Sequence, residues 1–313
     1  MSKHRHALPQ LTSDKLFLTD GGLETVLIFH HGVDLPLFAS IILFRDEDAP
    51  KHVRDYFIEY INTARAGAFG FILESSNWRA SPGWLKQLGI PETEFESLNK
   101  RAIAFLADLR NEFETPETPI VVSACVGPRG DGYVVENKMN SEEAEAYHAW
   151  QANLFADTDA DVITALTLNY VEEAIGISNA AKAAGMPVVI GFTVETDGRL
   201  PSGQGLGAAI EEVDSATGNF PAYYMINCAH PDHFTSTLDA GGRWVERIKG
   251  LRANAARLSH AELNEAEELE DGNPAEMGAQ YAALRKRFPE LNVLGGCCGT
   301  DHRHVAAIAE ACG

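Results

Sequence analysis

Eight short apolar runs rich in β-branched residues recur along the 313-residue chain, and they constrain its fold more than any other feature. Apolar runs of about four to eight residues between turn residues are typical of strands that are buried on both faces. The predicted strands lie at residues 16–20, 69–74, 120–125, 162–167, 188–194, 223–228, 245–251 and 293–297. The seventh is the weakest, because Glu246, Arg247 and Lys249 interrupt it.

Helical periodicity separates these runs. Val53, Phe57, Tyr60 and Ala64 recur at i, i+4, i+7 and i+11, which predicts an amphipathic helix. The same period appears within residues 98–109, 147–154 and 171–181. Strands that alternate with helices are typical of a parallel sheet covered on both faces. We therefore predict an α/β fold, a single (β/α)8 TIM barrel over residues 1–313, with a doubly wound open sheet as the alternative.

The charge balance restricts the class of partner. The chain has 45 Asp and Glu residues against 25 Lys and Arg residues, a formal net charge of −20. Such a surface repels phosphate backbones and anionic lipid, so we expect neither nucleic acid nor membrane as a partner. The first ten residues are polar and contain no apolar signal segment, and we expect a cytoplasmic protein. Its five cysteines are then candidates for metal binding or chemistry rather than for disulfides.

In a barrel of this kind the active site lies on the loops that follow the strands. Cys228 ends the sixth predicted strand, and Cys297 and Cys298 end the eighth. These strands are near neighbours around the barrel mouth, so the three thiols can converge. Three thiolates leave the fourth position of a tetrahedral zinc ion open, as in catalytic sites. A thiol bound there would lose its proton and could attack an activated methyl group.

The same residues allow other interpretations. Cys297 and Cys298 could form a vicinal disulfide or be inert buried thiols. The segment Gly295–Thr300, which precedes a helix, also has the composition of a phosphate-binding loop, as in a barrel lyase or aldolase. A non-catalytic barrel that binds thiols or zinc is a third interpretation. Residue spacing alone does not choose among them.

Three segments in this order resemble the homocysteine S-methyltransferase family: Asp20-Gly21-Gly22-Leu23-Glu24-Thr25, Ile226-Asn227-Cys228 and Gly295-Gly296-Cys297-Cys298-Gly299-Thr300. The resemblance covers nearly the whole chain. It implies a zinc ion (Zn²⁺) on Cys228, Cys297 and Cys298. It also implies methyl transfer, as in methionine biosynthesis, to homocysteine or a related small thiol acceptor. A chain of 313 residues has no room for the extra domains of folate- and cobalamin-dependent members, which favours a sulfonium or betaine-type methyl donor. The sequence does not determine the oligomeric state, and a homo-oligomer is possible.

The resemblance also implies roles for individual residues. Asp20 matches the acid that helps to hold the homocysteine amino group, and Gly21 and Gly22 would let the backbone approach the substrate. We predict Asp20 and Asn227 as catalytic residues, with Asn227 orienting the thiolate or the amino acid. Together with these two, the predicted substrate site contains Gly21, Gly22, Glu24, Glu74 and Thr167.

One position departs from the family pattern. Many members carry a Glu at the end of the fourth strand, where this chain has Leu166 or Thr167. We predict that Glu74 faces the pocket in compensation, with Glu195 as the alternative.

Two further segments allow predictions. Trp78 and Trp84 could form an apolar or cation–π wall for the methyl donor, with ordinary packing as the alternative. The acidic segment 260–271 is predicted to be a solvated helix.

Overall fold

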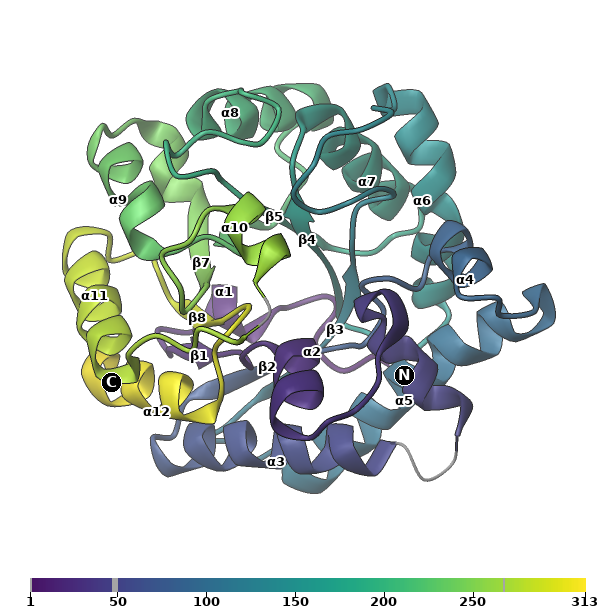
Figure 1. Cartoon of the computed structure of the whole chain (residues 1–313), viewed down its shortest axis with the longest axis horizontal. Helices are drawn as coiled ribbons and strands as arrows, with labels where there is room; N and C mark the ends of the chain where they lie inside the picture. Colours follow the sequence, from purple (N-terminus) through teal and green to yellow (C-terminus); the bar gives the residue numbers. More distant parts are fainter. Residues whose placement is uncertain (1, 47–49, 267) are drawn as a thin grey trace.

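A computed structural model describes residues 2–46, 50–266 and 268–313. Eight parallel strands close into a barrel in the order of the sequence (Figure 1). The strands are β1 (Phe17–Leu18), β2 (Gly70–Glu74), β3 (Ile120–Val126), β4 (Val162–Leu168), β5 (Val188–Phe192), β6 (Tyr223–Asn227), β7 (Ile248–Ala253) and β8 (Val293–Gly296). Phe17 of β1 pairs with Val293 of β8, so the sheet has no open edge and the (β/α)8 prediction is confirmed over the open-sheet alternative.

One helix of the outer ring follows each strand, as Figure 1 shows. These are α3 (Pro50–Ala66), α5 (Phe95–Phe113), α6 (Ser141–Ala156), α7 (Val171–Ala183), α8 (Leu206–Thr217), α9 (Pro231–Asp239), α11 (Pro274–Arg287) and α12 (His302–Cys312). A short helix, α1 (Pro9–Thr12), precedes β1, and other short helices lie in the connections: α2 (Leu23–Thr25), α4 (Pro82–Gln87) and α10 (His260–Glu265). None of the helices in the described ranges combines the length and the apolar character needed to cross a membrane.

The seventh strand begins later than predicted. Residues Arg243–Arg247 form a 3-10 helix, η5, and β7 begins at Ile248 and continues to Ala253. Val245 belongs to the 3-10 helix, so its apolar side chain does not mark the strand, and the predicted range 245–251 was displaced toward the N-terminus. The displacement matters for the site, because the correct register places Arg252 rather than Leu251 at the catalytic end of the strand.

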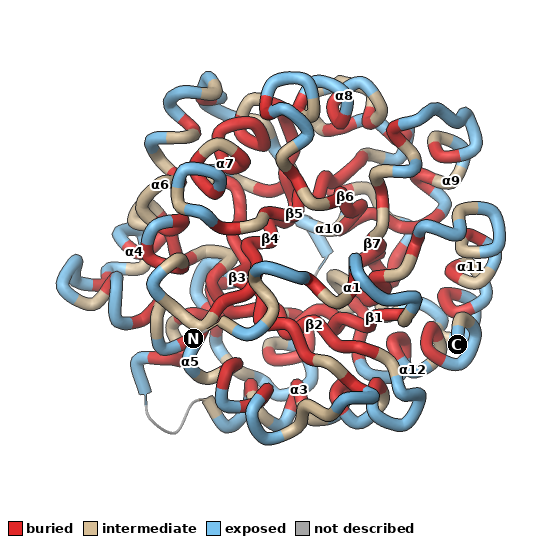
Figure 2. Tube along the Cα trace, turned by 180° about the vertical axis from the view of Figure 1, so that it is seen from behind, coloured by how far each residue is buried: buried red, intermediate tan, exposed pale blue. Residues whose placement is uncertain are grey.

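The N-terminal segment covers the bottom of the barrel. The Arg5 side chain donates hydrogen bonds to the carbonyl oxygens of Ala156, Thr158 and Ala160, at 2.8–3.1 Å. Leu8 joins the apolar cluster inside the barrel, packed with side chains such as Phe17. In Figure 1, α10 lies in front of the strands and α1 lies behind them. Figure 2 shows the molecule from behind, with α1 in front, so the two helices lie at opposite ends of the barrel. The catalytic end, beneath α10, is therefore the end that a substrate can enter.

Candidate active site

A cavity of about 360 Å³ opens at the C-terminal ends of the strands. The predicted site residues all line it: Asp20, Gly21, Gly22, Glu24, Glu74, Thr167, Asn227, Cys228, Cys297 and Cys298. Glu195 and Trp84 are not part of its lining in the described chain. The barrel thus brings together residues that are up to 278 positions apart (298 − 20).

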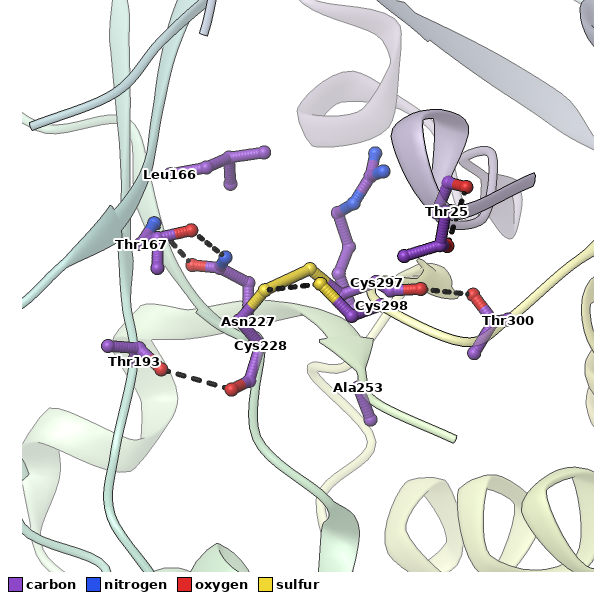
Figure 3. Close-up of a disulfide and its surroundings, with 12 residues drawn as sticks. Thr25, Leu166, Thr167, Thr193, Asn227, Cys228, Ala253, Cys297, Cys298 and Thr300 are labelled. Atoms are coloured by element: carbon purple, nitrogen blue, oxygen red, sulfur yellow. Dashed lines mark hydrogen bonds between the residues drawn. A yellow bond between two sulfur atoms is a disulfide. The ribbon is translucent and has the colours of Figure 1, made fainter. Parts of the chain in front are cut away.

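The three cysteine sulfurs converge at this cavity. Their Sγ atoms all lie within 4.8 Å of one another, and Figure 3 shows them meeting from the ends of β6 and β8. Cys228 and Cys297 are joined as a disulfide, and the Cys298 Sγ lies 3.8 Å from that of Cys228. Zinc–sulfur bonds of about 2.3 Å at tetrahedral angles put sulfurs about 3.8 Å apart. The three side chains therefore fit one zinc ion once Cys228 and Cys297 are reduced, and Cys297 does not pair with Cys298.

Glycine lets two active-site loops pack against each other. A Cβ atom at Gly22 would lie 2.6 Å from the carbonyl oxygen of Cys297, and one at Gly21 would lie 2.8 Å from that of Thr300. The Gly22 N–H donates to the Thr300 carbonyl at 3.0 Å. These contacts explain the glycine pair by loop packing against the cysteine loop. A close approach of substrate to the backbone is not needed to account for it.

The segment Gly295–Thr300 has little capacity to bind phosphate. Such a loop needs free backbone N–H groups directed at the anion. Here the N–H groups of Gly296, Cys297 and Thr300 donate to carbonyl oxygens of Asp20, Ala253 and Cys297, at 2.8–3.1 Å. The N–H of Gly299 donates to the Thr25 hydroxyl at 3.3 Å. Most backbone donors of this loop are therefore already engaged within the chain, which disfavours the phosphate-loop interpretation.

Cys228 has a left-handed backbone, with a φ of 54°, which is uncommon for a residue with a side chain. Its N–H donates to the carbonyl oxygen of Arg252 at 3.0 Å. Its own carbonyl oxygen accepts from the Thr193 hydroxyl at 3.1 Å, as Figure 3 shows, and contacts Nε2 of His260 at 2.9 Å. The surroundings thus hold both polar backbone groups of this cysteine.

Asp20 is already engaged by other residues of the chain. Its Oδ1 accepts from Nη1 of Arg252 at 2.8 Å, and its Oδ2 accepts from the Tyr56 hydroxyl at 2.9 Å. Burial opposes the charge of Arg252, but Asp20 and Glu74 together raise its pKa above the ordinary value for arginine. Asp20 therefore lies at the predicted place but is neutralised by an internal cation. Arg252 could have been identified as a site residue from its charge, since charged side chains are rare in the buried strands of such a barrel. It was missed because the predicted seventh strand ended at residue 251, one residue before it.

Glu74, at the end of β2, lines the cavity and is 6% exposed. Its Oε2 has no hydrogen-bond partner among the described residues. Burial raises the pKa of Glu74 to about 7, with the nearby Arg252 acting in the opposite direction. It is thus a buried carboxyl group whose pKa is raised toward neutrality, with an oxygen available for a ligand.

Asn227 and Thr167 are bonded to each other. The Thr167 N–H donates to Oδ1 of Asn227, and Nδ2 of Asn227 donates to the Thr167 hydroxyl, both at 2.8 Å (Figure 3). Thr167 is itself left-handed, with a φ of 63°. This reciprocal pair joins the end of β4 to the end of β6, immediately before Cys228. Its observed function is to fix the strand ends, while the predicted catalytic role of Asn227 stays a prediction.

The two tryptophans already contact a cation of the chain. The Arg79 guanidinium lies 4.7 Å from the Trp78 ring centroid and 4.2 Å from that of Trp84. The Trp84 indole N–H donates to the carbonyl oxygen of Pro128, and this side chain is buried. Packing, the alternative interpretation, therefore accounts for Trp84, whereas Trp78 also lines the cavity and its role as a wall for the methyl donor stays a prediction.

The segment 260–271 is the predicted solvated helix only in its first half, where most residues of α10 after the buried His260 are exposed. Helix α10 ends at Glu265, and residue 267 lies outside the described residues. Leu263, Leu269 and Glu270 line the cavity, so the segment covers the barrel mouth (Figure 1). His260, at its start, and Tyr133, in the loop after β3, were not predicted, because long loops have no periodic pattern to interpret.

Comparisons with known proteins agree with this geometry. The family model described as homocysteine S-methyltransferase matches residues 17–312. The crystal structure of the homocysteine methyltransferase MmuM from Escherichia coli in its oxidized form superposes with a TM-score of 0.74 at 20% identity, covering 99% of each chain. The metallated form of that enzyme gives a TM-score of 0.74 at 20% identity, covering 98% of this chain and 99% of that chain. These structural likenesses show the shared fold.

The matched range extends from the first residue of β1 to the last residue of α12 and includes all three cysteines of the cavity. The chain therefore belongs to the homocysteine S-methyltransferase family and is a methyltransferase for homocysteine or a related thiol.

Proposed function

We propose that this enzyme methylates homocysteine as a thiolate bound to a zinc ion, with Cys228, Cys297 and Cys298 as the protein ligands. The convergence of three Sγ atoms within 4.8 Å at the cavity carries the proposal. Zinc would stabilise the deprotonated form of the acceptor thiol at neutral pH. The acceptor sulfur then forms its bond to the methyl carbon as the bond from donor to methyl breaks. The bonding electron pair stays with the donor and neutralises its positive charge.

Glu74 is our candidate for the acceptor's ammonium group. Asp20 already accepts hydrogen bonds through both oxygens, whereas Glu74 has a buried oxygen without a partner. A carboxylate that binds an ammonium group forms a charge-assisted hydrogen bond, which is about twice as strong as a neutral one. Leu166 leaves β4 without an acid, so Glu74 would supply the negative charge from β2. Asp20 and Arg252 would then form a fixed, neutral pair beside the substrate.

The outer part of the cavity favours a cationic donor. Glu24, Asp131, Glu268 and Glu270 line the cavity, and Arg79, which also lines it, is paired with Asp131 at 3.6 Å and held against the two tryptophans. Burial raises the pKa of Glu24, while a 2.7 Å hydrogen bond from Ser40 acts in the opposite direction. Carboxylates around a narrow opening raise the local concentration of cations. We therefore propose a sulfonium or quaternary amine donor.

The zinc content of reduced protein purified without added metal tests the proposal. We expect one zinc per chain in the wild type and none in Cys298→Ala, with the apo stability of both measured as a control for folding. Homocysteine would then be assayed with S-methylmethionine, S-adenosylmethionine and betaine as donors. A reduced wild-type protein without zinc, yet active, would refute the zinc thiolate. Binding of homocysteine without turnover by any donor would favour the non-catalytic interpretation.

A further inference from the structure

The backbone of Cys228 needs external support. A residue with a side chain in a left-handed conformation costs about 1–3 kcal/mol and persists where its surroundings fix it. The carbonyl oxygen of Cys228 receives two contacts, from Thr193 on β5 and from His260 on α10. Because a carbonyl oxygen only accepts hydrogen bonds, Nε2 of His260 is the donor in this contact, and the same Nε2 also lies 3.2 Å from the Thr193 hydroxyl. A histidine distant in sequence thus holds the backbone of a predicted metal ligand.

The His260 ring is itself fixed on several sides. Its Nδ1 lies 2.9 Å from Oε1 of Glu195, and the side chain is 6% exposed. His260 is the first residue of α10, and Ser259 caps this helix with a capping box completed by Glu262. The ring therefore has little freedom to rotate away from Cys228.

A stacked aromatic ring connects His260 to another cysteine of the cluster. The rings of Tyr133 and His260 are nearly parallel, at 9°, with centroids 4.0 Å apart. The Tyr133 hydroxyl lies 3.6 Å from Sγ of Cys298. His260 thus contacts Cys228 directly and supports the residue that contacts Cys298. It lies between two of the three sulfur-bearing residues without being part of the three-cysteine cluster.

We propose that His260 is a positioning residue for the metal, and that Glu195, Thr193 and Tyr133 act with it. By donating to the Cys228 carbonyl it maintains the left-handed backbone that directs this thiol toward Cys297 and Cys298. By stacking on Tyr133 it keeps a phenol hydroxyl at the third sulfur. The inference rests on the zinc site of the proposed function and adds a residue that the three-cysteine pattern does not include. Partners that orient metal ligands in this way typically contribute about 10–100-fold to metal affinity.

The zinc affinity of reduced protein, measured by competition with a chromophoric chelator, tests this role. We expect His260→Ala to bind zinc about 10–100-fold more weakly than the wild type. The cobalt-substituted variant should show altered thiolate-to-cobalt charge-transfer bands, a signature that simple destabilisation does not produce. His260→Gln should recover most of the affinity, because its amide N–H can donate to the same carbonyl. Thr193→Val, which removes the other donor, should also bind zinc more weakly.

Two controls separate the possible causes. His302→Ala changes a histidine that also begins a helix but is 53% exposed, and it should leave zinc affinity unchanged. Ser259→Ala weakens the cap of α10 but keeps the imidazole itself, its partner Glu195 and its stacking partner Tyr133. Equal affinities for the wild type and His260→Ala would overturn the inference, as would a loss in Ser259→Ala as large as that in His260→Ala. A wild type that binds no zinc would instead refute the zinc site itself.

Discussion

Gly22 stands at a position where one added carbon atom would reach the cysteine loop. A Cβ atom there would lie 2.6 Å from the carbonyl oxygen of Cys297, closer than such contacts occur in proteins. We expect Gly22→Ala to displace Cys297 and to weaken zinc binding by at least about tenfold, since metal sites depend on ligand orientation. Chelator competition measures this loss. Gly205→Ala, at a glycine with open space around it, is the matched control. Unchanged affinity in Gly22→Ala would show that the loop can move aside.

Glu74 makes acceptor binding depend on pH. Its carboxyl group has a pKa of about 7, raised by burial, so it loses its charge as the pH falls below that value. If its carboxylate holds the ammonium group, the KM for homocysteine should increase as the pH is lowered through 7. Glu74→Gln cannot ionise, and its KM at pH 8 should be about tenfold higher than that of the wild type, because a charge-assisted hydrogen bond is lost.

The KM for the methyl donor is the control for Glu74→Gln. It should change little in this variant, because the proposed donor site lies in the outer part of the cavity. A wild-type KM for homocysteine that is flat between pH 6 and 8 would contradict the assignment. So would a Glu74→Gln variant whose KM for homocysteine matches that of the wild type.

Among the elements, the strands were predicted better than the loops. Seven predicted strands overlap the observed ones closely, because a strand buried on both faces must be apolar along its length. The seventh was displaced because Val245 and its neighbours form a 3-10 helix, for which an apolar side chain is an ambiguous signal. That error concealed Arg252, and with it the internal partner of Asp20. Asp20 was therefore predicted as a carboxylate open to substrate, because the displaced seventh strand did not show that Arg252 is its partner.

The connections after β3 and β7 carry Tyr133 and His260, which sequence analysis did not identify. Tyr133 lies in no periodic segment, and His260 begins a segment that was predicted only to be a solvated helix. Their stacking depends on how two separate connections fold over the barrel. The cysteines were identified because a barrel strand end fixes where each thiol lies. Residues on strand ends are predictable from topology, whereas residues on long loops require the structure.

The N-terminal segment should contribute to stability without affecting catalysis. Arg5 binds carbonyl oxygens at the end of α6 and in the turn that leads into β4, on the side of the barrel opposite the cavity. We expect Arg5→Ala to lower the free energy of unfolding by about 1–3 kcal/mol, because it leaves several acceptors without a donor. Urea unfolding measures this change. His6→Ala, at an exposed neighbouring position, is the control. A large loss of kcat in a fully folded Arg5→Ala protein would contradict the prediction that the N-terminal segment affects stability but not catalysis.

At the scale of the whole molecule, Cys228 and Cys297 can either form a disulfide or bind zinc as thiolates, but not both at once. Cys228 and Cys297 are paired as a disulfide, and the free cysteines are Cys125, Cys298 and Cys312. We expect oxidised, denatured protein to show three titratable thiols, and reduced protein five. Oxidised protein should bind no zinc and have no activity, and a thiol reductant should restore both, because zinc binds thiolates. Peptide mapping that finds Cys297 linked to Cys298 would contradict this pairing.

The segment beneath the barrel has a kinetic consequence. Because α1 and the residues around it cover one end, we expect both substrates to enter the cavity at the end beneath α10. Glu74 lies in the buried part of that passage, and the exposed Glu268 lines its outer part. A donor seated first would obstruct the route to the inner position. Turnover would then follow a compulsory order in which homocysteine enters first, the spent donor leaves next, and the methylated thioether is the last to depart.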